Sequence, residues 1–466
     1  MYYIIQKYMP KTTKQNTKQA FDAVLTILFS NFAIEKQQSD ECAHEASAHQ
    51  KTSSSKMPIK HNIGSNIMLQ PNQGLPMWLI LTLSAMAGIS VANIYYCQPL
   101  LNAISVDTGL STFEVNLMPV LTQGGYALGL LLIVPLGDLC SRRKTIIASF
   151  STVALALLAI FFAHSTPLLL AASFVTGFCS VAPQVFIPFV VLYAKPEQKE
   201  RKAGIVLSGL LTGILASRVV SGYVGHELGW RSMYLIAAAV MTVSTFAVMK
   251  VFPDVKPTYR GTFASLMKSI RKLAAEHPRS MLYSIRSAFA FGSMLGLWAC
   301  LAFRMKEAPF FADSDTVGML ALCGVVGALT ASNVGRYIPR FGVERINALG
   351  CMLILLSWII MSLFDHTYIG LILGVMIIDI GMQCIQLSNQ SATMRLCPEA
   401  TSRMNTIFMV TYFIGGSFGT FLSGTLWSLW GWMGTVAAGT CLVLCSMAAT
   451  MAVKILDRHS AKAQRY

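Results

Sequence analysis

From residue 77 to residue 453 the sequence is a succession of apolar runs, each about 20 residues long, separated by short polar breaks. A run of this length is what a helix needs to cross the hydrocarbon core of a bilayer. The runs lack the alternation of polar and apolar residues that is typical of membrane-barrel strands. Because lipid offers backbone amides no partner outside a helix or a closed barrel, the sequence predicts an all-α polytopic membrane protein. Its twelve expected spans are 78–98, 115–137, 144–163, 167–193, 203–226, 232–252, 282–303, 316–338, 345–364, 368–391, 404–427 and 433–453.

The composition excludes other classes of protein. Hydrophobic residues make up 54% of the chain and charged residues only 12%, with a mean hydropathy of +0.56. Soluble domains carry about 25% charged residues, so a soluble enzyme or a nucleic-acid-binding module is not expected. The eleven cysteines contain no CxxC pair, which favours small buried hydrophobes over a disulfide framework or a metal site. No P-loop lysine motif is present, so we expect neither ATP as the energy source nor any enzyme activity.

The net charge of +15 is explained by where the basic residues fall. If the N-terminus is cytoplasmic, the outward-facing segments contain only Arg231, Arg304 and Lys306, and Arg218 is assigned to the interior of a span. All other lysines and arginines are assigned to the cytoplasmic side, as the positive-inside rule requires. The distribution therefore predicts an even number of spans, with both termini in the cytoplasm.

An internal repeat relates the two halves of the chain. At a shift of 202 residues, Pro196-Glu197 matches Pro398-Glu399, Gly213 matches Gly415, and Gly229-Trp230 matches Gly431-Trp432. Repeats of this kind build two helix bundles that face each other across a central path and give alternating access. We therefore expect a transporter with the following parts: a polar and disordered N-terminal extension (1–76), a six-helix bundle (77–252), a cytoplasmic linker with an amphipathic stretch (253–281), a second six-helix bundle (282–455) and a cytoplasmic tail (456–466).

The loop from Val134 to Lys144 reads V-P-L-G-D-L-C-S-R-R-K. It resembles the signature loop of the major facilitator superfamily, G-x-x-x-D-R-x-G-R-R/K, but has Val134, Leu139 and Ser141 at three of the pattern's positions. A partial copy of the loop follows at 335–345, and the segment 93–99 is similar to the end of the first span in bacterial efflux members. The resemblance covers residue 77 to about residue 455.

This resemblance carries several expectations about the protein. It implies the major facilitator fold and the twelve-span drug/proton antiporter branch near bacterial sugar and purine exporters. It further implies a monomer in the bacterial inner membrane, with a small-molecule substrate, protons and the lipid bilayer as partners. No cofactor, metal or nucleic acid is expected. In this family the loop residues Asp138, Arg142, Arg143 and Lys144 would form a gate, with Asp138 and Arg142 acting as a latch against the start of span 11. The alternative is that Asp138 is an ordinary surface acid.

Asp379 lies near the middle of the tenth predicted span, where an ionisable group is costly unless it faces a polar cavity. Gln383, Gln386 and Gln390 follow it at helical spacing and share one face with it. We expect this stripe to line a transport path, with Asp379 as a coupling or substrate-contacting carboxylate. The alternative is a hydrogen-bond network that only holds helices together.

Arg218 is the other charge assigned to the interior of a span. Its guanidinium stays ionised, so it needs an internal partner or an anionic substrate, and the sequence leaves both open. Small residues at 209, 213, 217, 221 and 225 form a stripe beside it, which favours close helix packing. Weaker candidates for the cavity are Tyr96, Gln123 and Gln184, with Phe291, Trp298 and Tyr412 as aromatic walls.

Three functions are compatible with this pattern. The favoured one is proton-coupled efflux of a small organic compound or drug by a secondary transporter. The second is an uptake symporter or facilitator on the same fold. The third is a membrane protein that has lost transport activity.

Overall fold

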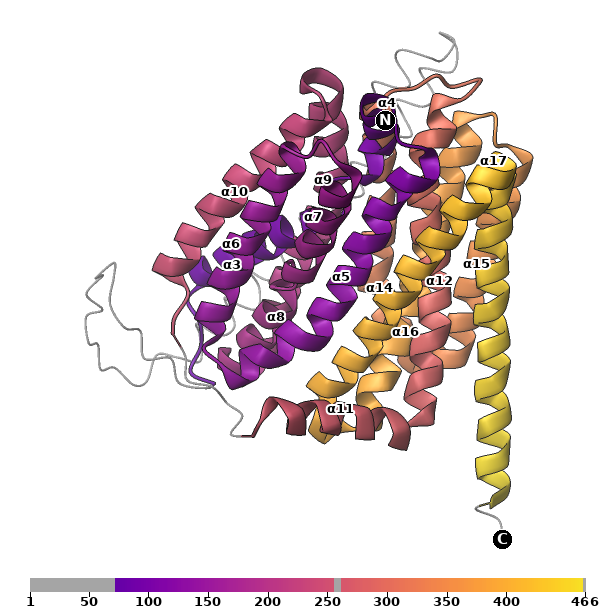
Figure 1. Ribbon diagram of the computed structural model, residues 1–466. Helices are drawn as coiled ribbons and strands as arrows, with labels where there is room; N and C mark the ends of the chain where they lie inside the picture. Colours follow the sequence, from indigo (N-terminus) through magenta and orange to yellow (C-terminus); the bar gives the residue numbers. More distant parts are fainter. Residues whose placement is uncertain (1–71, 255–260, 464–466) are drawn as a thin grey trace, which may run out of the picture. The chain divides into compact units, whose positions relative to one another are not determined.

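The structure is a computed structural model that describes residues 72–254 and 261–463, which form helices, turns and loops and no strands. Within them, the side chains of Asp138, Ala328, Ser332 and 454–463 are not described. Most of the expected N-terminal extension, residues 1–71, lies outside the described residues. The elements (Figure 1) are α3 Met77–Ala92, η1 Gln98–Leu100, α4 Leu101–Thr108, α5 Thr112–Leu139, α6 Arg142–Phe161, α7 Thr166–Cys179, α8 Pro183–Tyr193, η2 Pro196–Gln198, α9 Lys199–Leu228, α10 Trp230–Val251, α11 Phe263–Glu276, α12 Pro278–Lys306, α13 Ser314–Leu320, η3 Ala321–Gly324, α14 Val325–Phe341, α15 Val343–Leu363, α16 Tyr368–Leu396, η4 Pro398–Ala400 and α17 Thr401–Ala463.

The described part of the chain contains 10 helical segments that are long and apolar enough to cross a membrane. Two further features bear on the span count. The apolar helix α3 is shorter than these segments. The long element α17 consists of two helices that meet at Gly431, whose φ of 57° lies in the left-handed region that glycine adopts without strain.

Several predicted spans are interrupted. The first span was expected to be helical up to residue 98, but α3 ends at Ala92 and turns follow up to Cys97. The fourth span is divided into α7 and α8, and the break comes just before Pro183, which has no N–H to donate to a continuous helix. Pro188, also expected to kink this span, lies inside α8. The eighth span consists of α13, η3 and α14 in succession.

Glycines allow two pairs of helices to approach closely at equivalent places in the repeat. A Cβ added to Gly213 of α9 would lie 2.3 Å from the backbone oxygen of Gly88 in α3. A Cβ added to Gly415 of α17 would lie 2.4 Å from the backbone oxygen of Ala288 in α12. The predicted small-residue stripe of α9 is thus confirmed as a packing face, and its repeat partner in α17 packs in the same way.

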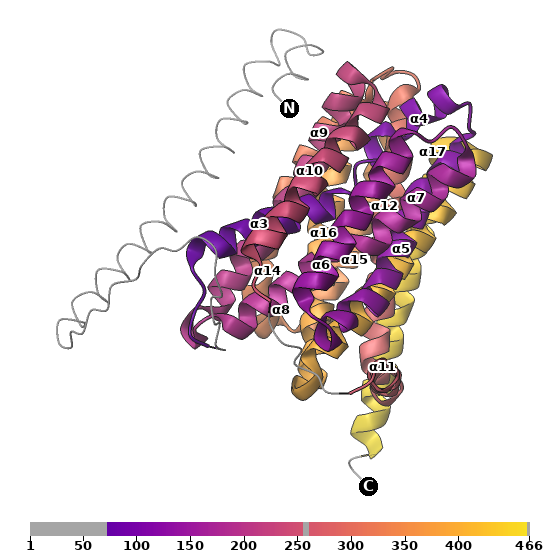
Figure 2. The same ribbon diagram turned by 60° about the vertical axis from the view of Figure 1, so that its left-hand side comes forward.

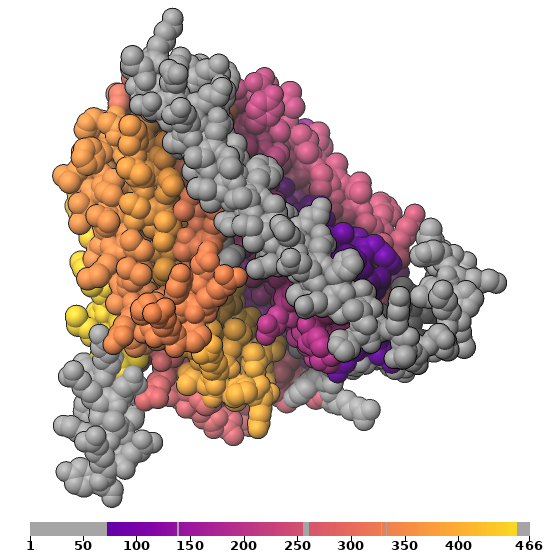
Figure 3. Space-filling model, turned by 180° about the vertical axis from the view of Figure 1, so that it is seen from behind, coloured from indigo at the N-terminus to yellow at the C-terminus, as the bar shows by residue number. Residues whose placement is uncertain are grey.

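We call residues 72–254 the N-terminal half and residues 261–463 the C-terminal half. They meet along α5 and α17, which lie side by side in Figures 1 and 2. Asn116 donates to the backbone oxygen of Thr420 at 2.9 Å, and Ser417 donates to that of Val120 at 2.8 Å. The rings of Tyr126 and Phe413 lie 4.4 Å apart. These contacts occupy the first half of α5. Figure 3 shows the two halves from behind, with the C-terminal half in salmon to yellow.

The other end of α5 leads into the basic residues at the start of α6, and we call this end of the helices the basic end. The starts of α6 and α9 both lie at this end. Arg143 of α6 contacts the end of α10 there, and Lys202 of α9 donates to Leu75, just before the start of α3. Helix α11 runs across the other helices at this level (Figure 1). It confirms the predicted amphipathic helix, and its buried residue Ile270 packs against Met404 and Ile407 of α17.

Candidate functional site

Arg218 lies in α9 and is 4% exposed. Its Nε donates to Oε1 of Gln98 at 2.7 Å. The guanidinium carbon lies 4.1 Å from the ring centre of Trp298 and 4.9 Å from that of Tyr95. The turns that follow α3 bring Tyr95 and Gln98 to this position, whereas Trp298 comes from α12 of the C-terminal half. A cation that is desolvated between two aromatic faces gains about 2 kcal/mol from them.

Asp379 reaches the same region from α16 of the C-terminal half. Its side chain is partly buried and lies against Gly324 and Gly327, which leave room for it. Its Oδ2 and a methyl group of Leu215 both come within 3 Å of the point where a Cβ on Gly324 would lie, at 2.9 and 2.7 Å. Leu215 is one turn before Arg218 on α9, and the opposite charges of Asp379 and Arg218 interact. The two halves therefore each contribute one charge to this site.

Aromatic rings surround the two charges. Phe291 and Tyr412 stack with their centres 3.8 Å apart, and the Tyr412 hydroxyl donates to Gln386 at 3.0 Å. The Asp379 charge also acts on Tyr412 and on Cys323. In the N-terminal half, the Tyr126 hydroxyl of α5 and Gln184 of α8 form a hydrogen bond. We call Tyr95, Gln98, Arg218, Trp298, Asp379 and Tyr412 the central site.

The structure distributes the other predicted path residues around this site. Gln386 reaches it through Tyr412, whereas Gln390 lies closer to the basic end and donates to Asn405 at 2.8 Å. Gln383 is partly buried on α16, one turn after Asp379 and before Gln386. Gln123 is fully buried at the contact between the halves, where it accepts from Thr420 at 3.0 Å. Tyr96 is buried next to Tyr95, and of the aromatic walls Trp298 touches the Arg218 cation.

The predicted gating loop lies at the basic end, away from the central site. Arg142 is buried and its Nε donates to the backbone oxygen of Gly137 at 3.2 Å. The Arg143 guanidinium donates to the backbone oxygen of Met249. Lys144 is exposed, and Ser141 accepts a hydrogen bond from its backbone N–H, which caps α6. The side chain of Asp138 lies outside the described residues, so its latch role stays a prediction.

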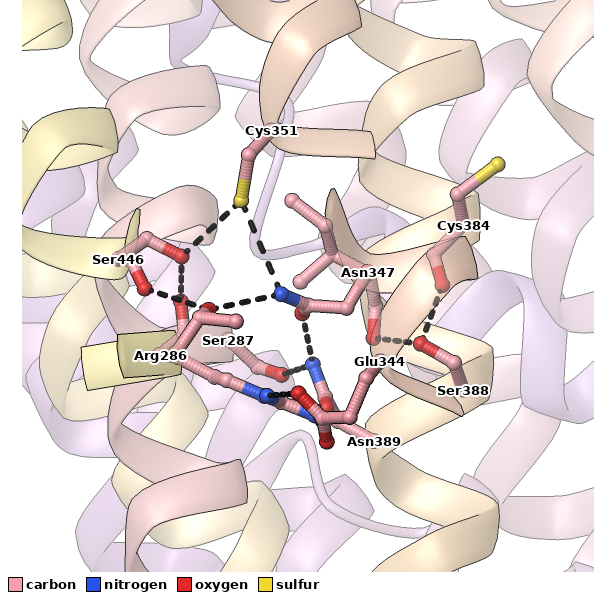
Figure 4. Close-up of polar contacts among 11 residues, drawn as sticks. Arg286, Ser287, Glu344, Asn347, Cys351, Cys384, Ser388, Asn389 and Ser446 are labelled. Carbon is pink, nitrogen blue, oxygen red and sulfur yellow. Dashed lines mark hydrogen bonds and ion pairs between the residues drawn. The ribbon is translucent and has the colours of Figure 1, made fainter. Parts of the chain in front are cut away.

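The C-terminal half also contains a buried charge that the sequence analysis assigned to the cytoplasmic side. Arg286 of α12 is fully buried and forms a two-pronged ion pair with Glu344 of α15, at 2.7 and 3.0 Å (Figure 4). Its Nε donates to Asn389 of α16 at 2.7 Å, and Asn389 donates to Asn347 at 2.8 Å. Its burial was not predicted, because a basic residue four positions inside a span looks like one that extends to the interface. The signal that could have found it is Asn389, a polar residue in the tenth span.

The fold and the central site define a membrane transport protein and not an enzyme. The family model described as "Major Facilitator Superfamily" matches residues 79–420, and the chain belongs to this family. It is 30% identical to the uncharacterized transporter YgaY of Escherichia coli O157:H7 over 82% of this chain and 96% of that protein. It is 28% identical to a probable transporter of Streptomyces coelicolor over 76% of this chain and 83% of that protein. A crystal structure of a mutant of the nucleoside transporter NupG has the same fold, with a TM-score of 0.67 and 13% identity over 81% of this chain and 99% of that one.

Proposed function

We propose that this protein is a secondary active transporter that exports a small organic compound or drug in exchange for protons by alternating access. The observation that carries the proposal is the central site, where Arg218 of the N-terminal half and Asp379 of the C-terminal half interact through their opposite charges. A carboxylate on one half that interacts with a cation on the other half can exchange that partner for a proton, which would couple protonation to movement of the halves.

The proposal includes the topology expected from the sequence. Twelve spans follow if α3 crosses the membrane and if the chain turns at Gly431 within α17. The basic residues at the starts of α6 and α9 then face the cytoplasm with both termini, in a bacterial inner membrane. Residues 77–252 and 282–455 would be the two bundles of a monomer, joined by the linker 253–281. The likeness to the drug/proton antiporter branch near sugar and purine exporters supports export over uptake.

The contacts between the halves support one conformation for this structure. Those between α5 and α17 extend from Phe113 to Tyr126, in the half of α5 that is farther from the basic end. We propose that this far end is closed and that the central site opens towards the basic end, which is the cytoplasmic side. The gating loop would close that end in the other state, with Asp138 and Arg142 as its latch.

The test is transport by the purified full chain in proteoliposomes that contain a pH-sensitive dye. A panel of organic compounds is supplied with and without a proton gradient, and counterflow is measured in parallel. Export by antiport predicts that compound and protons move in opposite directions, and that Asp379→Asn abolishes the proton flux. Uptake by symport would move both in the same direction. If no compound exchanges at any pH, the proposal of a transporter is wrong and the protein is inactive.

A further inference from the structure

The corner of the central site around Arg218 offers hydrogen-bond donors with no acceptor to receive them. Gln98 is fully buried, and its Oε1 accepts a hydrogen bond from Arg218 Nε. The other terminal atom of this side chain is therefore the amide nitrogen Nε2, which is a donor. This Nε2 has no hydrogen-bond partner. Among the described residues, the two Nη groups of Arg218 have no acceptor either. A buried donor without a partner is destabilising, so this corner favours the binding of a group that can accept these hydrogen bonds.

The surroundings of these donors narrow the chemistry of that group. A ligand that meets several donors and no acceptor must itself be an acceptor, and an anion satisfies such donors best. The rings of Trp298 and Tyr95 lie against the guanidinium, and its Nη groups match the two oxygens of a planar acid group. The nearby stacked rings of Phe291 and Tyr412 offer an apolar surface for the rest of the molecule.

We propose that the substrate is a small amphipathic organic anion, whose acid group binds the Arg218 guanidinium and Gln98 Nε2 and whose apolar body lies against Trp298 and Tyr412. The proposal rests on the transporter function proposed above, but not on exchange for protons, and names the substrate class. It gives Gln98 a specificity role. Asp379 is the internal competitor of the substrate, because it is the negative charge that acts on Arg218 when no anion is bound.

The test compares acids with their neutral amides, so that the shape of the ligand is kept and only its charge changes. The unfolding temperature of the detergent-solubilised full chain is measured with benzoate, phenylacetate, indole-3-acetate and hexanoate, with the four corresponding amides, and with benzylamine as a cation. A ligand that binds only the folded state raises this temperature. We expect at least one acid to bind about 10- to 100-fold more tightly than its amide, because hydrogen bonds to charged groups contribute about 1.5–3 kcal/mol.

Gln98→Glu is the decisive variant, because it puts a carboxylate of the same shape beside Arg218 and imitates the bound anion. We expect the unliganded variant to be at least as stable as the native chain and to have lost its response to every acid. Arg218→Gln should also lose this response. The matched control is Arg336→Gln, which removes an exposed arginine of α14 and should keep the response.

Three results would overturn the inference. One is that no acid stabilises the chain more than its amide does. Another is that benzylamine stabilises it in place of the acids. The third is that Gln98→Glu still responds to the acids. Counterflow separates these from a failure of the proposed function. Exchange of neutral or cationic compounds without exchange of acids refutes the anion and leaves the transporter, whereas no exchange of any compound refutes both.

Discussion

The buried ion pair between Arg286 and Glu344 allows a quantitative test of the C-terminal half. Arg286 is fully buried and makes three charge-assisted hydrogen bonds, two to Glu344 and one to Asn389. Glu344→Gln keeps the shape of the side chain and removes its charge. Breaking a buried pair in this way costs about 3–5 kcal/mol, because the remaining charge is left without compensation. Since the Glu344 side chain is 28% exposed, we expect the lower figure, about 3 kcal/mol.

The second variant removes the cation. Arg286→Met has a similar length, leaves Glu344 partly solvated and deprives Asn389 of a donor, so we expect a loss of about 2 kcal/mol. In the double variant no charge is buried, and only the loss at Asn389 remains, about 1 kcal/mol. The two single effects should therefore not add, and the coupling energy should be about 4 kcal/mol in favour of the double variant.

The assay is reversible unfolding of the full chain in mixed micelles with increasing sodium dodecyl sulfate, followed by circular dichroism. Glu307→Gln is the control, because Glu307 is 53% exposed and lies 3.4 Å from Arg304. Such a pair contributes about 0–1 kcal/mol. The reasoning is refuted if the double variant is as unstable as the sum of the two single variants, or if Glu344→Gln costs no more than the control.

Four further outcomes are expected. Asp379→Asn should retain counterflow of the substrate and lose the response to a proton gradient in proteoliposomes. Gly213→Ala should destabilise the chain by about 3 kcal/mol through overpacking against Gly88, as measured by the same unfolding assay. Gly204→Ala should be neutral or stabilising by up to about 1 kcal/mol, because a Cβ at Gly204 meets nothing within 4 Å. If the substrate is an anion at Arg218, the apparent affinity for benzenesulfonate, measured by thermal shift between pH 5 and 8, should rise as the pH falls, whereas exchange for protons at Asp379 predicts that it falls.

The sequence predicts the helices well and the pairing of their polar groups poorly. Helix positions follow from apolar runs and from Pro183, which are local features and are read directly from the chain. The glycine stripe around Gly213 is also local, because helical spacing alone puts its members on one face. The helix that this stripe contacts cannot be read from local sequence. The repeat does match Gly213 with Gly415, and both glycines lie at close contacts between helices.

Partners that are distant in the sequence could not be predicted. Arg286 and Glu344 are 58 residues apart, and both lie near the ends of predicted spans, where basic and acidic residues are common. Gln98 was not among the residues predicted to line the cavity. Its importance depends on the turns after Ala92, which bring it to Arg218, and no periodicity in the sequence indicates them. Candidate residues were therefore found where a single charge is out of place, and missed where two groups neutralise each other.

The central site also determines the sign of the coupling between protons and substrate. If an anion binds Arg218, the charged carboxylate of Asp379 opposes it, so protonation of Asp379 must strengthen binding and the two ligands bind together. Among the described residues, the Asp379 charge also acts on Cys323 and Tyr412, whose protonated thiol and phenol carry no charge. A sulfonate keeps its own charge at every pH of this assay, so any change of its affinity with pH reports on the protein. If instead substrate and proton exclude each other at Asp379, as exchange requires, affinity falls as the pH falls. The direction in which the affinity changes with pH thus decides between an anion that moves together with protons and a compound that is exported in exchange for them.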